Sequence, residues 1–399
     1  MSNEDVSKPK DSDSSFNSEL TDSLAKIRAT NNEIEKQGNG FELQSPQEFR
    51  DDFSALAQYA TDFVGIETMQ FEVTQATIPI FNALKAAKVN GAKTRFVYDR
   101  VAREHVRSGN DQAWSKYGKT VYKGNKSELQ QAINSREQQI AELEELGITH
   151  SSFRDRGENE RGSHNHIKLA IVDDVAWFGT MNLRQVDFEM SNFMIKVTNP
   201  KLVEVLKEIF LKTEPSSAIA DEVFVGEEHG LYKDTQLLVD GGEKGESVIY
   251  DKALEMAKSL GPEDEFIMIN QWPPAKTMFG EIADVLQEKI EAGSTGLFLL
   301  SPKEYYHPLS KKLGTAFQVW LNQESKKSPN FNFKNLVRPT HAKAFVIKRA
   351  DGDIEVLFGS HNFAERTVNN GTKELAMWSK DPEIVGQIMA FLEKVQAEK

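Results

Sequence analysis

One pattern of residue types occurs twice in this chain, and it constrains the fold more than any single motif does. Each copy has a histidine, a lysine two positions later, an apolar run, a short polar turn, a second apolar run and a Gly-Ser/Thr-x-Asn ending. The first copy occupies residues 166–182 and the second occupies residues 341–362. A lone histidine beside an apolar strand is usually structural, but repetition of the whole pattern favours a shared function.

The histidine and lysine of each copy begin a run of β-branched and aromatic residues. Side chains two positions apart in a strand point to the same face, so His166 shares a face with Lys168, and His341 shares one with Lys343. The turn after each run then brings the Gly-Ser/Thr-x-Asn ending back to the level of the histidine. Each copy therefore predicts a proton shuttle, a cation and small hydrogen-bond donors at one place.

The elements expected around the two hairpins follow the same order in both halves of the chain. In the first half the patterns predict a helix from residue 46, a strand at 63–71, a helix at 78–89, a strand at 94–99, a helix at 127–146, the hairpin, a strand at 193–197 and a helix from residue 200. In the second half they predict a helix at 247–260, a strand at 265–270, a helix at 278–292, a strand at 297–300, the hairpin, a strand at 374–378 and a helix from residue 382. This order predicts a duplicated α/β domain with a parallel or mixed sheet covered by helices.

Changes in composition indicate the domain boundaries. Residues 1–44 are rich in Ser, Asn, Asp, Glu and Lys, which predicts a disordered N-terminal tail. Apolar residues at roughly helical spacing leave room for a short helix between residues 18 and 36. We expect the first domain at 45–217, a linker at 218–233 and the second domain at 234–399.

Composition also excludes several kinds of chemistry. The chain has no cysteine, so disulfides, zinc–thiolate sites and cysteine nucleophiles are excluded. The formal net charge of -13 disfavours broad contact with polyanions and so counts against a nucleic-acid substrate. Because there is no run of about 18 apolar residues and no secretory signal, we expect a cytoplasmic protein whose contact with a membrane, if any, is peripheral.

The duplicated motif resembles that of the phospholipase D superfamily, whose signature is His-x-Lys-(x)4-Asp followed by Gly-Ser-x-Asn. The resemblance extends from residue 46 to the C-terminus, and the run Leu237-Leu-Val-Asp-Gly-Gly242 is similar to the bacterial cardiolipin synthase and phospholipase D branch. It implies two similar α/β/α sandwich domains related by a pseudo-twofold axis, with one active site at their seam. It also implies chemistry that needs no metal and no other cofactor.

By the same resemblance, one histidine attacks phosphorus and becomes a phosphohistidine, while the other protonates the leaving alkoxide. The resemblance favours His166 as the nucleophile and His341 as the general acid. The residues expected to be catalytic are His166, Lys168, Asp173, Asn182, His341, Lys343, Ser360, Asn362 and Glu374. The residues expected to bind substrate are Gly179, Thr180 and Gly359.

The chain departs from the family pattern in both hairpins. Lys348 stands where the second copy should carry the aspartate that Asp173 supplies in the first, although it would face away from the histidine in a regular strand. Thr180 replaces the usual serine and keeps a hydroxyl group.

A third departure concerns the carboxylate that the family places after each motif to orient a histidine. Glu374 fits this position in the second copy, whereas Asn192 occupies it in the first. Asp187 and Glu189 are the nearby alternatives. Because of these differences, a catalytically inactive relative of the family that binds phosphate is an alternative.

The leading functional prediction is a phosphodiesterase or phosphatidyltransferase that acts on phospholipid head groups. A metal-independent nuclease or another phosphodiesterase would use the same residues. The alternative that is not an enzyme is an inactive scaffold that binds a phosphate. The expected partners are a phospholipid or other phosphodiester substrate and a peripheral membrane surface, with nucleic acid less favoured. The sequence does not fix the oligomeric state, and a monomer is compatible with it.

Overall fold

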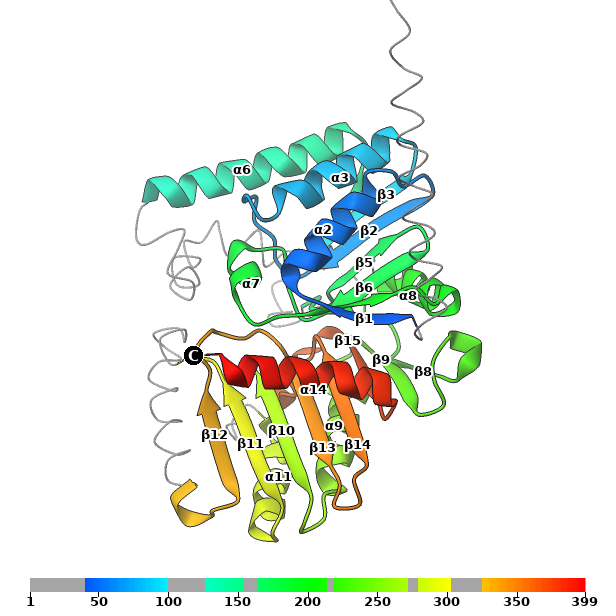
Figure 1. The fold of residues 1–399 in the computed structure, drawn as a ribbon. Coiled ribbons are helices and arrows are strands. Elements are labelled where there is room, and N and C mark those ends of the chain that lie inside the picture. The colour runs from blue at the N-terminus through cyan, green and yellow to red at the C-terminus, as the bar shows by residue number, and fades with distance from the viewer. Residues whose placement is uncertain are drawn as a thin grey trace, which may run out of the picture.

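The computed structural model describes residues 40–99, 126–153, 164–213, 218–271, 279–302 and 325–398. The short helix expected between residues 18 and 36 lies outside these ranges. The described residues form two mixed sheets, each flanked by helices (Figure 1).

The first half of the chain forms a seven-stranded sheet in the order β1-β7-β6-β5-β2-β3-β4. Its strands are β1 (Phe41–Gln44), β2 (Phe63–Thr68), β3 (Lys93–Asp99), β4 (Thr149–Phe153), β5 (Leu169–Val172), β6 (Val175–Gly179) and β7 (Met194–Val197). Its helices are α2 (Pro46–Ala57), α3 (Ile78–Val89), α6 (Lys126–Glu145), α7 (Gln185–Glu189) and α8 (Pro200–Thr213). Strands β2, β3 and β4 are parallel neighbours, and the other pairs are antiparallel.

The second half forms an eight-stranded sheet in the order β12-β11-β10-β13-β14-β15-β9-β8. Its strands are β8 (Glu222–Val225), β9 (Thr235–Gly241), β10 (Glu265–Asn270), β11 (Thr295–Leu300), β12 (Phe331–Asn335), β13 (Ala344–Lys348), β14 (Ile354–Gly359) and β15 (Lys373–Ser379). Its helices are α9 (Val248–Lys258), α11 (Glu281–Glu291), α13 (Glu365–Asn370) and α14 (Pro382–Ala397), with a 3-10 turn η1 at Glu227–His229.

The two sheets have the same topology. Reading the second sheet from β9 to β12 gives the order in which the first sheet runs from β1 to β4, and β8 is an extra strand on its edge. The prediction of two similar α/β/α domains is confirmed, and so is the duplication from which it was made.

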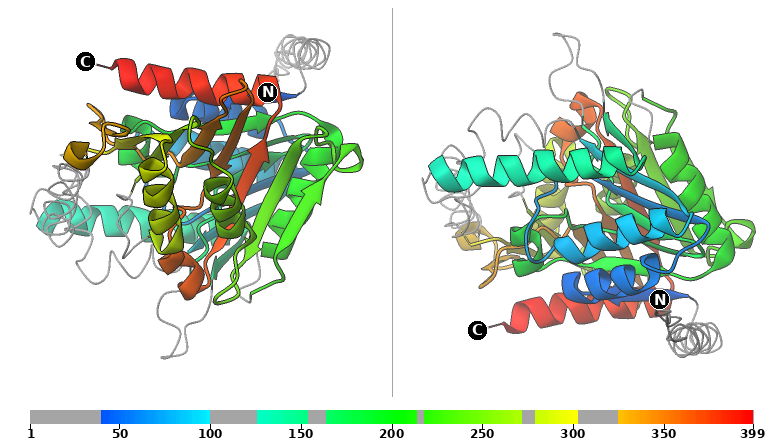
Figure 2. Two further views of the ribbon diagram at one scale, coloured as in Figure 1. Left: turned by 90° about the horizontal axis from the view of Figure 1, so that it is seen from below. Right: turned by 90° about the horizontal axis from the view of Figure 1, so that it is seen from above.

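Three cores hold the layers together. One core lies between the first sheet and helices α2, α3 and α6, and another lies between the second sheet and helices α9 and α11. The third is shared: it contains residues from both sheets together with α8 and α14, so the two domains bury one common apolar interior. Figure 2 shows α14 of the second half (red) beside the first elements of the first half (blue), where α14 contacts β1. At its centre Phe178 stacks on Phe358 with a ring-centroid distance of 6.2 Å, and both rings precede the glycine of their own hairpin.

Local sequence explains where several helices begin. Ser45 accepts a hydrogen bond from the amide of Glu48, whose carboxylate accepts one from the amide of Ser45, and Pro46 occupies the first turn of α2. Asp381 caps α14 in a similar way by accepting from the amides of Glu383 and Ile384.

Two boundaries expected from the sequence are wrong. The tail was expected to reach residue 44, but residues 41–44 form β1, which pairs antiparallel with β7. The linker expected at 218–233 contains β8 and η1, and β8 pairs with β9 in the second sheet. Strands β4, β9 and β12 were not predicted at all. In the part of the chain that the structure describes, no helix is both long enough and apolar enough to cross a membrane.

Candidate active site

The two motif histidines meet at the seam between the domains. His166 lies just before β5 and His341 just before β13, and their ring centroids are 6.1 Å apart. The seam is fixed by backbone contacts in both directions. The amide of His166 donates to the carbonyl of Lys373 in the second repeat at 2.9 Å, and the amide of Ser191 donates to that of Pro339 at 2.9 Å. Each histidine segment is therefore held by the other repeat.

The two motif lysines are buried on the same side of the strands as their histidines. The Nζ of Lys343 donates to the carbonyl oxygen of His341 at 2.6 Å, and the Nζ of Lys168 donates in the same way to that of His166. Burial lowers the pKa of Lys168 to about 7, and burial together with the nearby Lys168 lowers the pKa of Lys343 well below its usual value. An anion bound between the two amines would favour their protonated forms, because a nearby negative charge raises the pKa of an amine.

His166 is oriented by a carboxylate of the other repeat. Its Nδ1 lies 2.9 and 3.0 Å from the two carboxylate oxygens of Glu374, which also accepts a hydrogen bond from the hydroxyl of Ser360. Burial alone would raise the pKa of Glu374, but His166 beside it lowers that pKa to about 2. With Nδ1 committed to an ionised carboxylate, Nε2 is the ring nitrogen left to react.

The protonation of His166 follows from the same surroundings. Burial lowers the pKa of His166 to about 4, assisted by Lys168 and Lys343 and opposed by Glu374. The imidazole is therefore neutral near pH 7, which is the form that can act as a nucleophile.

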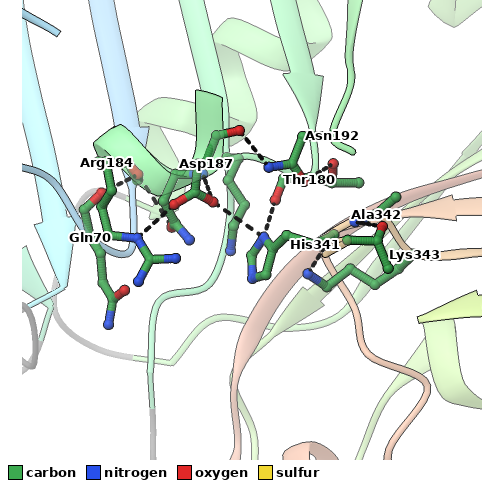
Figure 3. A network of polar contacts seen from close by, with 12 residues as sticks. Gln70, Thr180, Arg184, Asp187, Asn192, His341, Ala342 and Lys343 are labelled. Carbon is green, nitrogen blue, oxygen red and sulfur yellow. Dashed lines mark hydrogen bonds and ion pairs between the residues drawn. The ribbon is translucent and has the colours of Figure 1, made fainter. Parts of the chain in front are cut away.

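His341 has a different environment. Its Nδ1 donates to the backbone carbonyl of Thr180 at 2.6 Å, and the carboxylate of Asp187 lies 3.6 Å away (Figure 3). Asp187 is held in turn, because it accepts from the amide of Asn182 at 3.1 Å and from Nε of Arg184 at 2.6 Å. Burial lowers the pKa of His341 well below its usual value, and the positive charge of Lys343 adds to this.

The two repeats differ at the position of the orienting carboxylate. Asn192 corresponds to Glu374, because Thr180 contacts Asn192 at 3.3 Å as Ser360 contacts Glu374. Asn192 does not reach His341; its amide nitrogen donates to the backbone carbonyl of Asp187 at 2.8 Å. The carboxylate near His341 therefore comes from Asp187 on α7, one of the two alternatives that the sequence suggested.

Most of the expected site residues lie together, but Asp173 does not. Its carboxylate accepts hydrogen bonds from the amides of residues 61, 62 and 63 at 3.3, 3.1 and 2.9 Å, at the turn between β5 and β6. That turn is at the end of the hairpin opposite His166, about seven residues or roughly 23 Å away along the strand. The prediction that Asp173 is a catalytic residue is therefore corrected. Lys348 is the last residue of β13, at the same distant end, so its departure from the motif does not touch the site.

Close packing of neighbouring strands explains why the two motif positions are glycine, which the sequence did not show. A Cβ at Gly179 would lie 2.5 Å from the carbonyl oxygen of Phe193, and one at Gly359 would clash with the backbone of Leu375 and Ala376. Neighbouring strands approach these glycines closely, and a side chain there would push β6 from β7 or β14 from β15. Binding of substrate by Gly179 and Gly359 stays a prediction.

Four buried residues around the histidines, Asn165, Arg184, Glu67 and Asp99, were not predicted from the sequence. Asn165 precedes His166, donates from its amide to Asp99 at 2.6 Å and donates from its side chain to Glu67. Arg184 contacts Asp187 as described above. The only signal in the sequence for Asn165 and Arg184 was their place next to the motif, whereas Glu67 and Asp99 stand out as carboxylates in apolar strands.

The comparisons with known proteins agree with the geometry. Residues 54–213 match a family described as "Cardiolipin synthase, PLD-like domain". No curated protein matches the chain significantly.

Two solved structures share the fold over nearly all of the chain. A phosphatidylserine synthase from Haemophilus influenzae Rd KW20 has a TM-score of 0.58 and 13% sequence identity, and the match covers 92% of this chain and 90% of that one. A polyphosphate kinase from Porphyromonas gingivalis has a TM-score of 0.51 and 14% identity over 90% of this chain, which spans 50% of the length of the kinase. At these identities the likeness concerns the fold alone. Residues 54–213 are therefore similar to a PLD-like domain, the motif found in them recurs in the second half, and the chain shares the fold of these two structures.

Proposed function

We propose that this protein is a phosphodiesterase or phosphatidyltransferase that acts on phospholipid head groups through a phosphohistidine intermediate. The observation that carries the proposal is the pair of imidazoles, 6.1 Å apart, with the ionised Glu374 on one ring and two buried lysines beside them. The lipid substrate is supported by the cardiolipin synthase description of the matching family and by the phosphatidylserine synthase that shares the fold.

In the first step His166 is the nucleophile. The anionic phosphodiester, when bound beside His341, favours the protonated ring, because a nearby negative charge raises the pKa of a histidine. The Nε2 of His166 attacks phosphorus while the bond between phosphorus and the leaving oxygen breaks, and the imidazolium of His341 gives its Nε2 proton to that oxygen. Glu374 stabilises the positive charge that forms on the ring of His166. Lys168 and Lys343 stabilise the negative charge that builds on the non-bridging oxygens.

In the second step His341 acts as the base. Its neutral ring takes a proton from water or from the hydroxyl group of an acceptor alcohol, whose oxygen attacks phosphorus as the bond to His166 breaks. Water gives hydrolysis, and an alcohol gives transfer of the phosphatidyl unit. Both histidines then return to their starting states.

A nucleic-acid substrate would require the same chemistry but a different surface. The net charge of -13 opposes the long-range attraction that proteins use to hold a polyanion. The lipid substrate therefore fits the chain better.

The experiment uses purified full-length protein, phosphatidylglycerol vesicles and a chelator of divalent metals. We expect free glycerol or cardiolipin as product, and a phosphohistidine that is trapped by acid-free denaturation with alkaline work-up, where phosphohistidine is stable. His166→Ala should abolish both signals, while His229→Ala, which removes an exposed histidine on η1, should leave both unchanged. Cleavage of single-stranded DNA under the same conditions, with no lipid product, would favour the nuclease; no turnover of either substrate would favour the scaffold.

A further inference from the structure

We propose that Lys373, which belongs to neither copy of the motif, is a positioning residue that determines which histidine attacks. It anchors the segment that carries Glu374 to the first repeat and so orients His166. The inference deepens the proposed function and rests on it, because it concerns the nucleophile of that reaction. Lys373 is the first residue of β15 and is fully buried, and the next residue in the chain is the carboxylate that contacts His166.

The backbone of Lys373 is fixed against the segment that leads to His166. Its amide donates to the carbonyl of His164 at 2.9 Å, and its carbonyl accepts from the amide of His166 at 2.9 Å. The two segments thus form a short parallel bridge across the seam, centred on Asn165. A shift of Lys373 would therefore move Glu374 relative to the ring that it orients.

The side chain of Lys373 enters the first repeat and holds this bridge. Its Nζ donates to the carbonyl oxygen of Thr213, the last residue of α8, at 2.9 Å. The hydroxyl oxygen of Thr213 lies 2.9 Å from a carboxylate oxygen of Glu67, and the side-chain amide of Asn165 donates to the same carboxylate. Lys373 and Glu67 have further polar interactions as well. The contacts return to the residue before His166, so they close a ring across the seam.

Burial makes this anchor hard to displace. Lys373, Glu67 and Asp99 are each at most 1% exposed. Removing an ionisable side chain from water is unfavourable unless polar partners replace the water, so such a group does not readily leave the partners that satisfy it. Asp99 adds to the anchor, because it accepts from the amide of Asn165 at 2.6 Å and lies 3.7 Å from Nδ1 of His164.

In the other repeat the position of Lys373 is occupied by a serine. Ser191 corresponds to Lys373, because it forms the equivalent bridge with the residue before His341. A serine is uncharged and much shorter than a lysine, so it cannot anchor its segment in the opposite repeat in the same way. The Nδ1 of His341 correspondingly contacts a backbone carbonyl, whereas that of His166 contacts a carboxylate.

The two buried carboxylates of the anchor are also replaced. Ile269 corresponds to Glu67, since each lies opposite the third residue after its histidine. Ser301 corresponds to Asp99, since the side chain of each accepts from the amide of the residue before its histidine. The ionisable groups of the anchor therefore lie on the side of the histidine that Glu374 orients.

The test uses Lys373→Met, which keeps the length of the side chain and removes its donors. We expect kcat on phosphatidylglycerol vesicles to fall by about 10- to 100-fold with little change in KM, the usual effect of losing a group that supports a functional histidine. Lys373→Arg should restore part of kcat. Lys196→Met is the matched control: it removes a buried lysine of β7 that donates to Asp52 at 2.8 Å, and it should lower the thermal midpoint without a comparable loss of kcat.

A proton NMR signal separates positioning from folding and does not require turnover. The Nδ1 proton that His166 shares with Glu374 should give a downfield resonance, assigned by its absence in His166→Ala. We expect it in the wild type and in Lys196→Met, and we expect it to be lost or shifted upfield in Lys373→Met. Mass spectrometry of the trapped intermediate should place the phosphoryl group on His166 in the wild type and show less of it there in Lys373→Met.

Each outcome decides the inference. An unchanged resonance in Lys373→Met, or a wild-type phosphoryl group on His341, would overturn it. If the wild type turns over no lipid, the proposed function is removed, and the resonance alone then decides whether Lys373 holds the pair. Should Lys373→Met not fold, Lys373→Gln takes its place with the same outcomes, because it keeps a donor but removes the charge.

Discussion

The carboxylate of Glu374 and the imidazole of His166 belong to different repeats, and yet they are hydrogen-bonded at 2.9 Å. Neither domain can orient His166 alone, because the ring comes from one half of the chain and its orienting carboxylate from the other. The proposed reaction of His166 therefore depends on correct packing of the seam between the two domains.

The first prediction concerns that contact. Glu374→Gln keeps the size of the side chain but removes the charge that stabilises the imidazolium of His166. We expect kcat to fall by about 100- to 10,000-fold, the range seen when the carboxylate partner of a catalytic histidine is neutralised. Glu355→Gln, a buried glutamate of β14 that pairs with Arg349, is the matched control and should change the thermal midpoint without a comparable loss of kcat. Equal losses in both variants would show that Glu374 acts on folding alone.

The second prediction concerns pH. The pKa of His166 is about 4, so the neutral nucleophile persists as the pH falls from 7 to about 5. We expect kcat/KM to lose activity on its acid side near pH 4, measured in buffers of constant ionic strength. An acid limb near pH 6.5, the ordinary value for histidine, would contradict a buried and neutral His166.

Stability should change over a related range of pH. Burial lowers the pKa of His361 to about 4 in the folded protein, whereas in the unfolded chain it is near 6.5. As the pH falls from 6.5 to 4, the unfolded chain takes up the proton and the folded protein does not, so the free energy of unfolding decreases. The loss attributable to His361 is on the order of 3 kcal/mol. His361→Asn should flatten this part of a plot of unfolding free energy against pH, and an unchanged slope would contradict the prediction.

The fourth prediction tests whether Asp173, a motif residue, contributes to catalysis. Asp173 accepts three backbone hydrogen bonds at the far end of the first hairpin, so Asp173→Ala should lower the free energy of unfolding by about 1–3 kcal/mol, the cost of leaving such amides without their partner. We expect kcat at 25 °C to stay within about 2-fold of the wild type, since a change this far from the site has no electrostatic route to it at ordinary ionic strength. A large fall in kcat with normal stability would restore Asp173 to the catalytic set.

The duplicated fold was predictable because its signal is repeated. Long apolar runs and helix-period patterns occur in the same order twice, so an error in one copy is corrected by the other. Strand β1 was missed because four residues, Phe41-Glu-Leu-Gln44, follow a polar segment and are too few to establish a period. What stabilises β1 comes from far along the chain: its pairing with β7, the hydrogen bond from Trp177 to Gln44, and the one from Leu43 to Gln387.

The sequence predicted which residues form the site, but it did not predict which of them contact one another. The spacing of His166 and Lys168 puts both on one face of a strand, but nothing in the sequence says that Glu374 reaches His166 across the seam. The same limit explains Asp173, whose motif position suggested chemistry although its contacts are those of a cap at the end of a strand. Arg184 follows the first motif without belonging to it, and only the folded arrangement brings it near His341.

The last prediction tests whether Asp187 supports His341 as Glu374 supports His166, although the two carboxylates stand at different positions of their repeats. Asp187→Asn keeps one acceptor oxygen, so it can accept from Arg184 or from the amide of Asn182 but not from both, and it removes the charge 3.6 Å from His341. We expect kcat to fall by about 10- to 100-fold, the usual effect of losing a supporting carboxylate beside a functional histidine. Because Asn192 corresponds to Glu374, adding Asn192→Glu to this variant places a carboxylate where the other repeat has one, and part of the lost kcat should return. Asn192→Glu in the wild-type background is the control, since two carboxylates beside one imidazole should repel each other and give no gain. If the double variant is no faster than Asp187→Asn, the two repeats do not support their histidines in equivalent ways, and the role of Asp187 is confined to holding α7 and Arg184.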